Sequence, residues 1–157
     1  MFDPTEFIKQ HFQYLVDEYS FSIDHEGYSP EVMGNAEVVL KSASTVVKVV
    51  VDRSQVLLNI GELSWPEKDW FEFSDVVQFF NPNLKEVYDF SVGSLDNQAY
   101  IESQTKRLAL LLRQFCEPLL IGDFSMQDEI REIEKKRVTA MLEHFEKLSQ
   151  NRRRTAG

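Results

Sequence analysis

The chain has 157 residues, with 26 Asp or Glu against 17 Lys or Arg, so its net charge at pH 7 is −9. Phosphate backbones and anionic lipids repel such a chain, so the composition argues against nucleic acid or a membrane surface as partner and suits a basic protein. Hydrophobic residues make up 43% of the sequence, which is enough for a core. We therefore expect one domain over residues 1–150, followed by a basic, disordered tail over residues 151–157.

Cysteine usage and the N-terminus indicate the compartment. Cys116 is the single cysteine, so the chain has no internal disulfide framework. The opening MFDPTEF lacks the basic and apolar regions of a signal peptide, and no apolar run reaches the roughly 20 residues of a transmembrane helix. The sequence predicts a cytoplasmic protein.

The first residues predict an amphipathic helix. Asp3 is a good N-cap and Pro4 suits the first helical position. Apolar residues then recur at steps of three and four: Phe7, Ile8, Phe12, Leu15, Val16 and Tyr19. Alternating side chains predict a first strand over residues 19–25, and glycine and proline predict a turn over residues 26–30.

Residues 35–61 predict an antiparallel meander. Three runs rich in Val, Leu and Ile are separated by short polar breaks, and β-branched residues suit a pleated surface. Alternate positions are apolar in the second and third runs: Val47, Val49, Val51, Val56, Leu58 and Ile60. Each strand therefore presents one apolar face that a helix must cover.

Residues 63–80 combine aromatic and acidic side chains. We expect a loop, a short strand near residues 70–73, and a short helix that is capped by Ser74 and stops before Pro82.

Two further helices complete the chain. Ser94 or Asp96 caps a long helix that Pro118 kinks or ends, and Gly122 suits the position after a helix. Ser125 opens the last helix, whose highly charged first half we expect to project into solvent. Its apolar positions are irregular: Ile130, Ile133, Val138, Met141, Leu142, Phe145 and Leu148. Packing against the helix before it is favoured over pairing with a second copy.

These elements predict an α+β fold. It has a small antiparallel β-meander of about four strands, with an N-terminal helix and a C-terminal helical hairpin packed mainly on one face.

Residues that commonly carry chemistry are sparse. His11, His25 and His144 show no metal-ligand spacing, and packing or surface roles suit them better. Cys116 lies near an apolar helix face beside Glu117, which disfavours a thiolate. No nucleotide-binding or nucleophile motif occurs. The sequence therefore predicts no catalytic residue, no metal and no cofactor.

The aromatic and acidic segment is the candidate binding site. Tryptophan dominates interface hot spots, and carboxylates around it suit a basic partner. The predicted partner-binding residues are Trp65, Glu67, Asp69, Trp70 and Glu72. The alternative is that these rings complete the core over the edge of the sheet.

The order of elements, the Tyr19–Ile23 strand and the phrase PLLIGDF at residues 118–124 resemble small bacterial α+β proteins. Some of these are immunity proteins of polymorphic toxin systems. The resemblance implies a non-enzymatic protein that plugs the basic cleft of a toxin, and it implies no shared catalytic residue.

Two other functions remain open. One is a hydrolase or small-ligand-binding domain, with a pocket between sheet and helices in which His25 and carboxylates converge. The other is a homodimer formed through the last helix, so the chain is expected to be a monomer or a homodimer.

Overall fold

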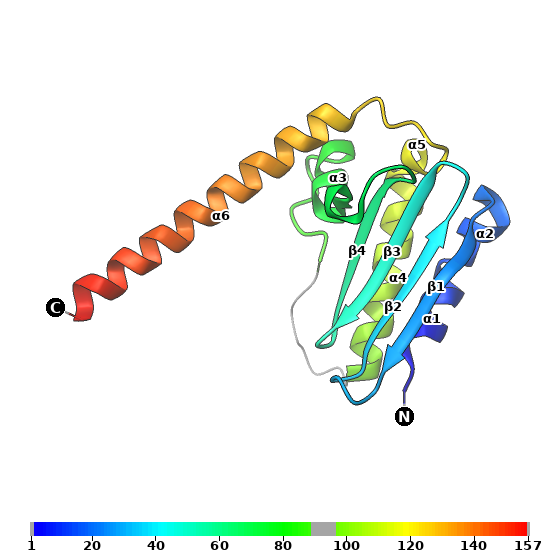
Figure 1. The fold of residues 1–157 in the computed structure, drawn as a ribbon, viewed down its shortest axis with the longest axis horizontal. Helices are drawn as coiled ribbons and strands as arrows, with labels where there is room; N and C mark the ends of the chain where they lie inside the picture. Colours follow the sequence, from blue (N-terminus) through cyan, green and yellow to red (C-terminus); the bar gives the residue numbers. More distant parts are fainter. Residues whose placement is uncertain (1, 89–96, 157) are drawn as a thin grey trace.

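The computed structural model describes residues 2–88 and 97–156, which form the predicted α+β fold (Figure 1). Its antiparallel sheet has five strands in sequence order, one more than the four or so expected. The strands are β1 (Ser22–Ser29), β2 (Asn35–Lys41), β3 (Thr45–Asp52), β4 (Gln55–Glu62) and β5 (Phe71–Glu72). The helices are α1 (Pro4–His11), α2 (Gln13–Tyr19), η1 (Glu67–Asp69), α3 (Phe73–Phe80), α4 (Asn97–Phe115), α5 (Glu117–Leu120) and α6 (Gln127–Ala156).

The predicted alternation in the meander is confirmed. Val47, Val49 and Val51 of β3 pair with Ile60, Leu58 and Val56 of β4, and all six side chains are buried. Helices α1 and α4 cover this face of the sheet (Figure 1). Burying one such side chain contributes about 1.5–3 kcal/mol, so this face forms the centre of the core.

The N-terminal region follows the prediction in part. Asp3 caps α1, because its carboxylate accepts a hydrogen bond of 2.9 Å from the backbone N–H of Thr5. The single predicted helix is broken at Phe12 into α1 and α2. Ser20 then takes a left-handed conformation, with φ of 62°, and ends α2. The first strand accordingly begins at Ser22 and not at residue 19.

The turn predicted over residues 26–30 is wrong. Strand β1 continues to Ser29 because Gly27 pairs with Glu37 of β2, and the turn lies in residues 30–34. The β1–β2 register shifts by one residue between Ile23 and His25, which marks a β-bulge at the edge of the sheet.

Helices α3 and α4 end close to the positions that the sequence predicts. A short strand precedes α3, although Glu72 and not Ser74 supplies the capping side chain. Helix α4 stops at Phe115, Pro118 lies in the first turn of α5, and Gly122 has a φ of 90°. The predicted caps Ser94 and Asp96 lie outside the described residues.

Helix α6 departs from the prediction. It has 30 residues and extends away from the body instead of lying back along α4 as a hairpin (Figure 1). Its charged first half contacts α3, and the second half projects, which is the reverse of the expected order. Residues 139–156 are all exposed, and residues 151–156 continue the helix where a disordered tail was expected.

An ion pair between a buried carboxylate and a partly exposed arginine joins α6 to α3. The Arg137 guanidinium donates to both carboxylate oxygens of Asp75 on α3, at 2.8 and 3.0 Å. The Asp75 side chain is only 1% exposed, and Ile130, one of the first residues of α6, is fully buried. The base of α6 is therefore bound firmly to the domain, although its far end contacts nothing in the described part of the chain.

Candidate functional site

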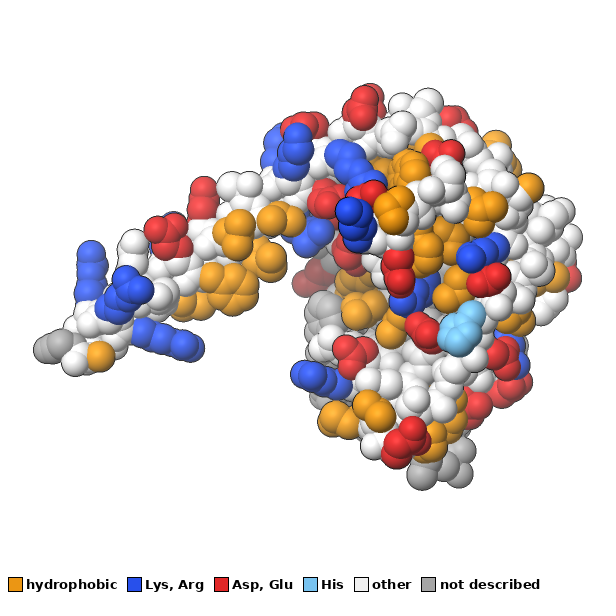
Figure 2. All heavy atoms as spheres, viewed as in Figure 1, with side chains coloured by type: hydrophobic (Ala, Val, Ile, Leu, Met, Phe, Trp, Pro, Cys, Tyr) orange, Lys and Arg blue, Asp and Glu red, His pale blue; other side chains and the backbone are white. Residues whose placement is uncertain are grey.

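In the described part of the chain, no α-helix lies over the sheet face opposite α1 and α4. Both polar and apolar side chains line this face (Figure 2). His25 Nε2 lies 2.9 Å from a Glu37 carboxylate oxygen, and the other Glu37 oxygen lies 3.4 Å from Lys48 Nζ. Lys48 also binds Glu67, which precedes β5. A chain of one hydrogen bond and two ion pairs therefore crosses β1, β2 and β3 and reaches the predicted binding segment.

A shallow hollow of about 440 Å³ lies on this face. Its walls include His25, Asn35, Glu37 and Asp52. Gly27 of β1 lies opposite Glu37 and contributes no side chain, which leaves the space open. The hollow also has apolar walls at Ala36, Val50 and Val51, and it lies on the outside of the sheet, whereas the predicted pocket lay between sheet and helices.

The carboxylates of the hollow are already engaged. Glu37 binds His25 and Lys48, and Asp52 accepts a hydrogen bond of 3.3 Å from the Asn35 side chain. A His–Glu pair can orient an imidazole for proton transfer, but solvent screens an exposed pair such as this one. The arrangement therefore suits recognition of a polar or cationic group better than catalysis.

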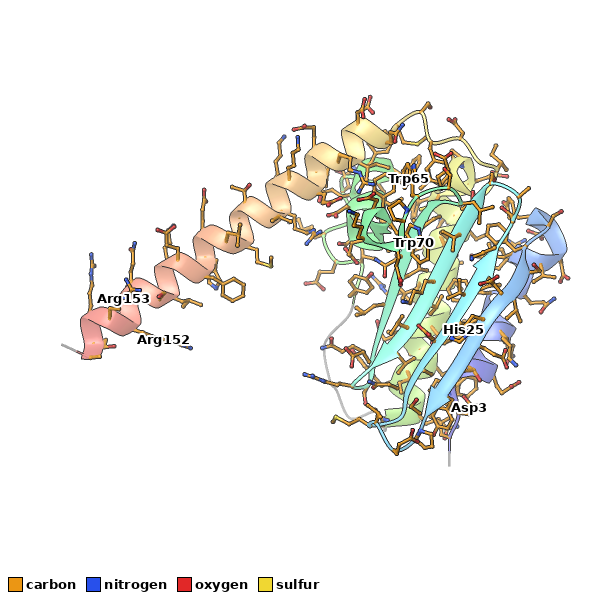
Figure 3. The ribbon with its side chains drawn as sticks, viewed as in Figure 1. Asp3, His25, Trp65, Trp70, Arg152 and Arg153 are labelled. Carbon is orange, nitrogen blue, oxygen red and sulfur yellow. The ribbon has the colours of Figure 1, made fainter. Side chains whose placement is uncertain are left out.

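Trp70 lies on the same face, next to this network (Figure 3). Its indole ring covers Gly61 of β4 so closely that a Cβ at residue 61 would stand 2.5 Å from Cδ1 of the ring. The indole N–H donates to the Trp65 carbonyl at 3.3 Å. The ring is half-buried, so part of its surface remains available to a partner.

Trp65 takes a different role. Its ring packs edge-on against Phe71 and Phe124, each with a centroid separation of 5.2 Å. The Arg131 guanidinium of α6 stacks over both Trp65 and Phe71, at 5.2 and 4.3 Å from the ring centroids. Trp65 therefore joins the core to the base of α6, as the alternative interpretation of these rings expects.

Glu72 is also turned inward. Its carboxylate accepts a hydrogen bond of 3.0 Å from the Ser74 N–H at the start of α3, and it also accepts from the Tyr88 hydroxyl. Burial raises the pKa of the Glu72 carboxyl, and the Tyr88 hydrogen bond opposes that shift. The structure thus leaves Glu67 and Asp69 exposed beside the half-buried Trp70, whereas the equally half-buried Trp65 packs against the core and Glu72 is bonded to Ser74 and Tyr88.

The other candidate residues lie apart from this surface. Cys116 is fully buried, and burial raises the pKa of its thiol far above the ordinary value, which disfavours a thiolate as the sequence predicts. His11 is partly buried beside α4, and His144 lies on the exposed half of α6. In residues 2–88 and 97–156, no group of three or more His, Cys, Asp or Glu side chains is arranged to hold a metal ion. No helix there is both long and apolar enough to cross a bilayer.

Sequence reasoning missed two features of the surface. A packing or surface role was favoured for His25, and its alternative place was a pocket between sheet and helices, yet it lines a hollow on the outer face of the sheet. The signal was Gly27 two positions later, on the same face of the strand, where a missing side chain leaves space. The exposed apolar positions of α6 were identified in the sequence but were expected to be covered by the preceding helix.

Comparisons with known proteins add no relative. No protein-family model matches the chain, and no curated protein and no solved structure shows a significant match.

Proposed function

We propose that the chain is a non-enzymatic protein-binding module that holds a basic protein partner on the helix-free face of its sheet. The distribution of charge carries this proposal. Residues 1–126 contain 20 carboxylates and nine Lys or Arg, a net charge of −11, whereas residues 127–157 contain six carboxylates and eight Lys or Arg, a net charge of +2. The body is therefore more acidic than the chain as a whole.

The proposed contact surface comprises Glu67, Asp69, Trp70 and the adjoining hollow. Glu67 and Asp69 are exposed, and the half-buried Trp70 ring, the next residue after Asp69, packs closely on Gly61 of the sheet. A rigid aromatic ring loses little entropy on binding, and carboxylates around it steer a basic partner during encounter. Glu37 and Asp52 extend the acidic surface into the hollow, where a Lys or Arg side chain of the partner has room.

This surface supports the immunity-like function that the sequence resemblance implies. A protein that blocks the basic cleft of a toxin needs an acidic, rigid and exposed face, and it needs no catalytic group. The lone, buried Cys116 suits the reducing cytoplasm in which such a protein acts.

A second candidate function rests on the His25–Glu37 pair. Both side chains line the hollow, so a small polar molecule is the alternative occupant. Small-ligand binding predicts a rise in melting temperature in a metabolite screen, and His25→Ala should abolish that rise.

Two variants of equal charge test the proposed surface. Glu67→Lys with Asp69→Lys reverses the charge at the surface, whereas Glu6→Lys with Asp17→Lys makes the same change on α1 and α2. The control is well matched because Glu6 and Glu67 each lose one exposed ion pair with a lysine. Tagged wild-type protein and both variants are used to capture proteins from the native lysate at low and high salt.

We expect wild type and the control variant to retain a basic protein at low salt. Both should release it at high salt, because salt screens the contacts between opposite charges. The surface variant should lose it. Equal retention by both variants would refute the proposed surface. Capture of an acidic protein would also refute it.

A further inference from the structure

The exposed half of α6 carries an apolar stripe that no described residue covers. Hydrophobic side chains gather along one side of this helix (Figure 2). Met141 is 44% exposed, Leu142 60%, Phe145 58% and Leu148 42%. Val138, Met141, Phe145 and Leu148 follow one another at steps of three, four and three, which is the spacing of a coiled-coil seam.

We propose that a second copy of the chain covers this stripe, and that the two α6 helices pair antiparallel. In such a pair the second helix runs in the opposite direction beside the first. Met141 then faces Phe145 of the second copy, and Val138 faces Leu148. The stripe is thus complementary to itself, as a two-fold symmetric interface requires.

Charge along α6 selects the antiparallel orientation. Residues 127–134 contain four carboxylates and one arginine, whereas residues 147–156 contain four Lys or Arg and no carboxylate. Antiparallel pairing places each basic end beside an acidic start. Parallel pairing would place the two arginine clusters side by side, where they repel each other.

One pair of residues makes the orientation specific. In the same reversed alignment, Arg152 lies level with Glu134 of the second copy. Arg152 follows Phe145 by seven residues and so continues the seam, and its side chain projects from the far end of α6 (Figure 3). Glu134 is partly exposed, at the base of the helix, and its present partner Arg131 lies 2.9 Å away. Arg152 would therefore reach an accessible carboxylate next to the acidic body.

This surface is separate from the helix-free sheet face, so the dimer does not depend on the proposed function. The interface has only two heptads of seam, and short helices pair weakly on their own. We therefore expect a dimer that dissociates in the micromolar range, roughly 1–100 μM.

Sedimentation equilibrium of the full chain measures this directly. Phe145→Asp should weaken dimerisation by about 30-fold, because it removes a large apolar side chain from the seam. Ala140→Asp adds the same charge at an exposed position outside the seam and should leave the dimer intact. Circular dichroism of both variants checks that the helix and the body remain folded.

A charge exchange tests the orientation. Arg152→Glu and Glu134→Arg should each weaken the homodimer by about tenfold. An equimolar mixture of the two variants restores both cross-pairs, so it should form a heterodimer of nearly wild-type affinity. If the mixture stays as weak as either variant alone, the antiparallel arrangement is wrong.

Two other results would overturn the proposal. A wild-type chain that remains monomeric at 100 μM has no such interface at any relevant concentration. Co-sedimentation of a monomer with phosphatidylserine vesicles, lost in Phe145→Asp, would assign the stripe to a membrane surface instead.

Discussion

The Trp70 ring lies directly against the backbone of Gly61, and any larger residue at position 61 would collide with it. A Cβ there would stand 2.5 Å from Cδ1 and 3.0 Å from Cγ of the indole. The contact gives Trp70 one fixed orientation on the helix-free face of the sheet. It also explains why a glycine occupies the otherwise regular strand β4.

Gly61→Ala should therefore displace Trp70 and lower the free energy of unfolding by about 1–3 kcal/mol. Urea denaturation measures this change. Gly27→Ala is the matched control, because its Cβ would meet its nearest atom, His25 Nε2, at an ordinary 3.7 Å. In a protein that already carries Trp70→Ala, Gly61→Ala should lower the free energy of unfolding only slightly. If the loss is as large as in wild type, collision with the Trp70 ring is not its cause.

Arg137→Ala should loosen α6 from α3. It leaves the buried Asp75 carboxylate without its bidentate partner, and we expect a loss of about 2 kcal/mol in the free energy of unfolding. Hydrogen exchange should accelerate in α3 and in residues 127–137. Arg153→Ala, at the far end of α6, should change neither quantity. Lysine at position 137 should restore only part of the loss, because it cannot form both hydrogen bonds.

The raised pKa of Glu72 predicts a pH dependence of stability. Burial raises this pKa above its ordinary 4.5, so the folded state binds the proton more tightly than the unfolded state does. The resulting stabilisation is complete below about pH 4.5 and is lost as pH rises through the raised pKa. Glu72→Gln keeps an oxygen that can accept from the Ser74 N–H and carries no charge.

The free energy of unfolding of wild type, relative to Glu72→Gln, should therefore fall as pH rises from 4.5 to 7. Urea denaturation at several pH values gives this difference directly, and the other carboxylates cancel because both proteins share them. A difference that rises with pH would mean that the hydrogen bonds to Glu72 outweigh its burial.

Local patterns in the sequence predicted most of the fold. Alternation at period two identified the buried face of β3 and β4, and Asp3 and Gly122 occupied their expected positions at helix ends. These features depend on neighbouring residues, and so a local pattern is sufficient to find them. The first strand was misplaced because Gly27 was interpreted as a turn residue, although it pairs within a strand.

The candidate site and the course of α6 depend on distant contacts. Trp65 and Trp70 are five residues apart in one aromatic segment and both are half-buried, and only distant contacts decide that Trp65 packs against Phe124 while Trp70 packs against Gly61 of the sheet. Asp75 and Arg137 are 62 residues apart, and neither has a local signal that identifies its partner. The predicted hairpin followed from amphipathicity alone, which does not specify the neighbour that a helix contacts.

The β-bulge in β1 has a consequence for solubility. This strand forms one edge of the sheet, and an edge with free backbone groups can recruit a strand from another molecule. The register shift next to Ile23 interrupts the regular ladder, and two ion pairs, Asp24–Lys41 and Glu26–Lys9, place charge along the strand. A β-strand arriving from a neighbouring molecule would have to bury those charges against an irregular backbone. The edge is thereby protected from the strand addition that begins aggregation.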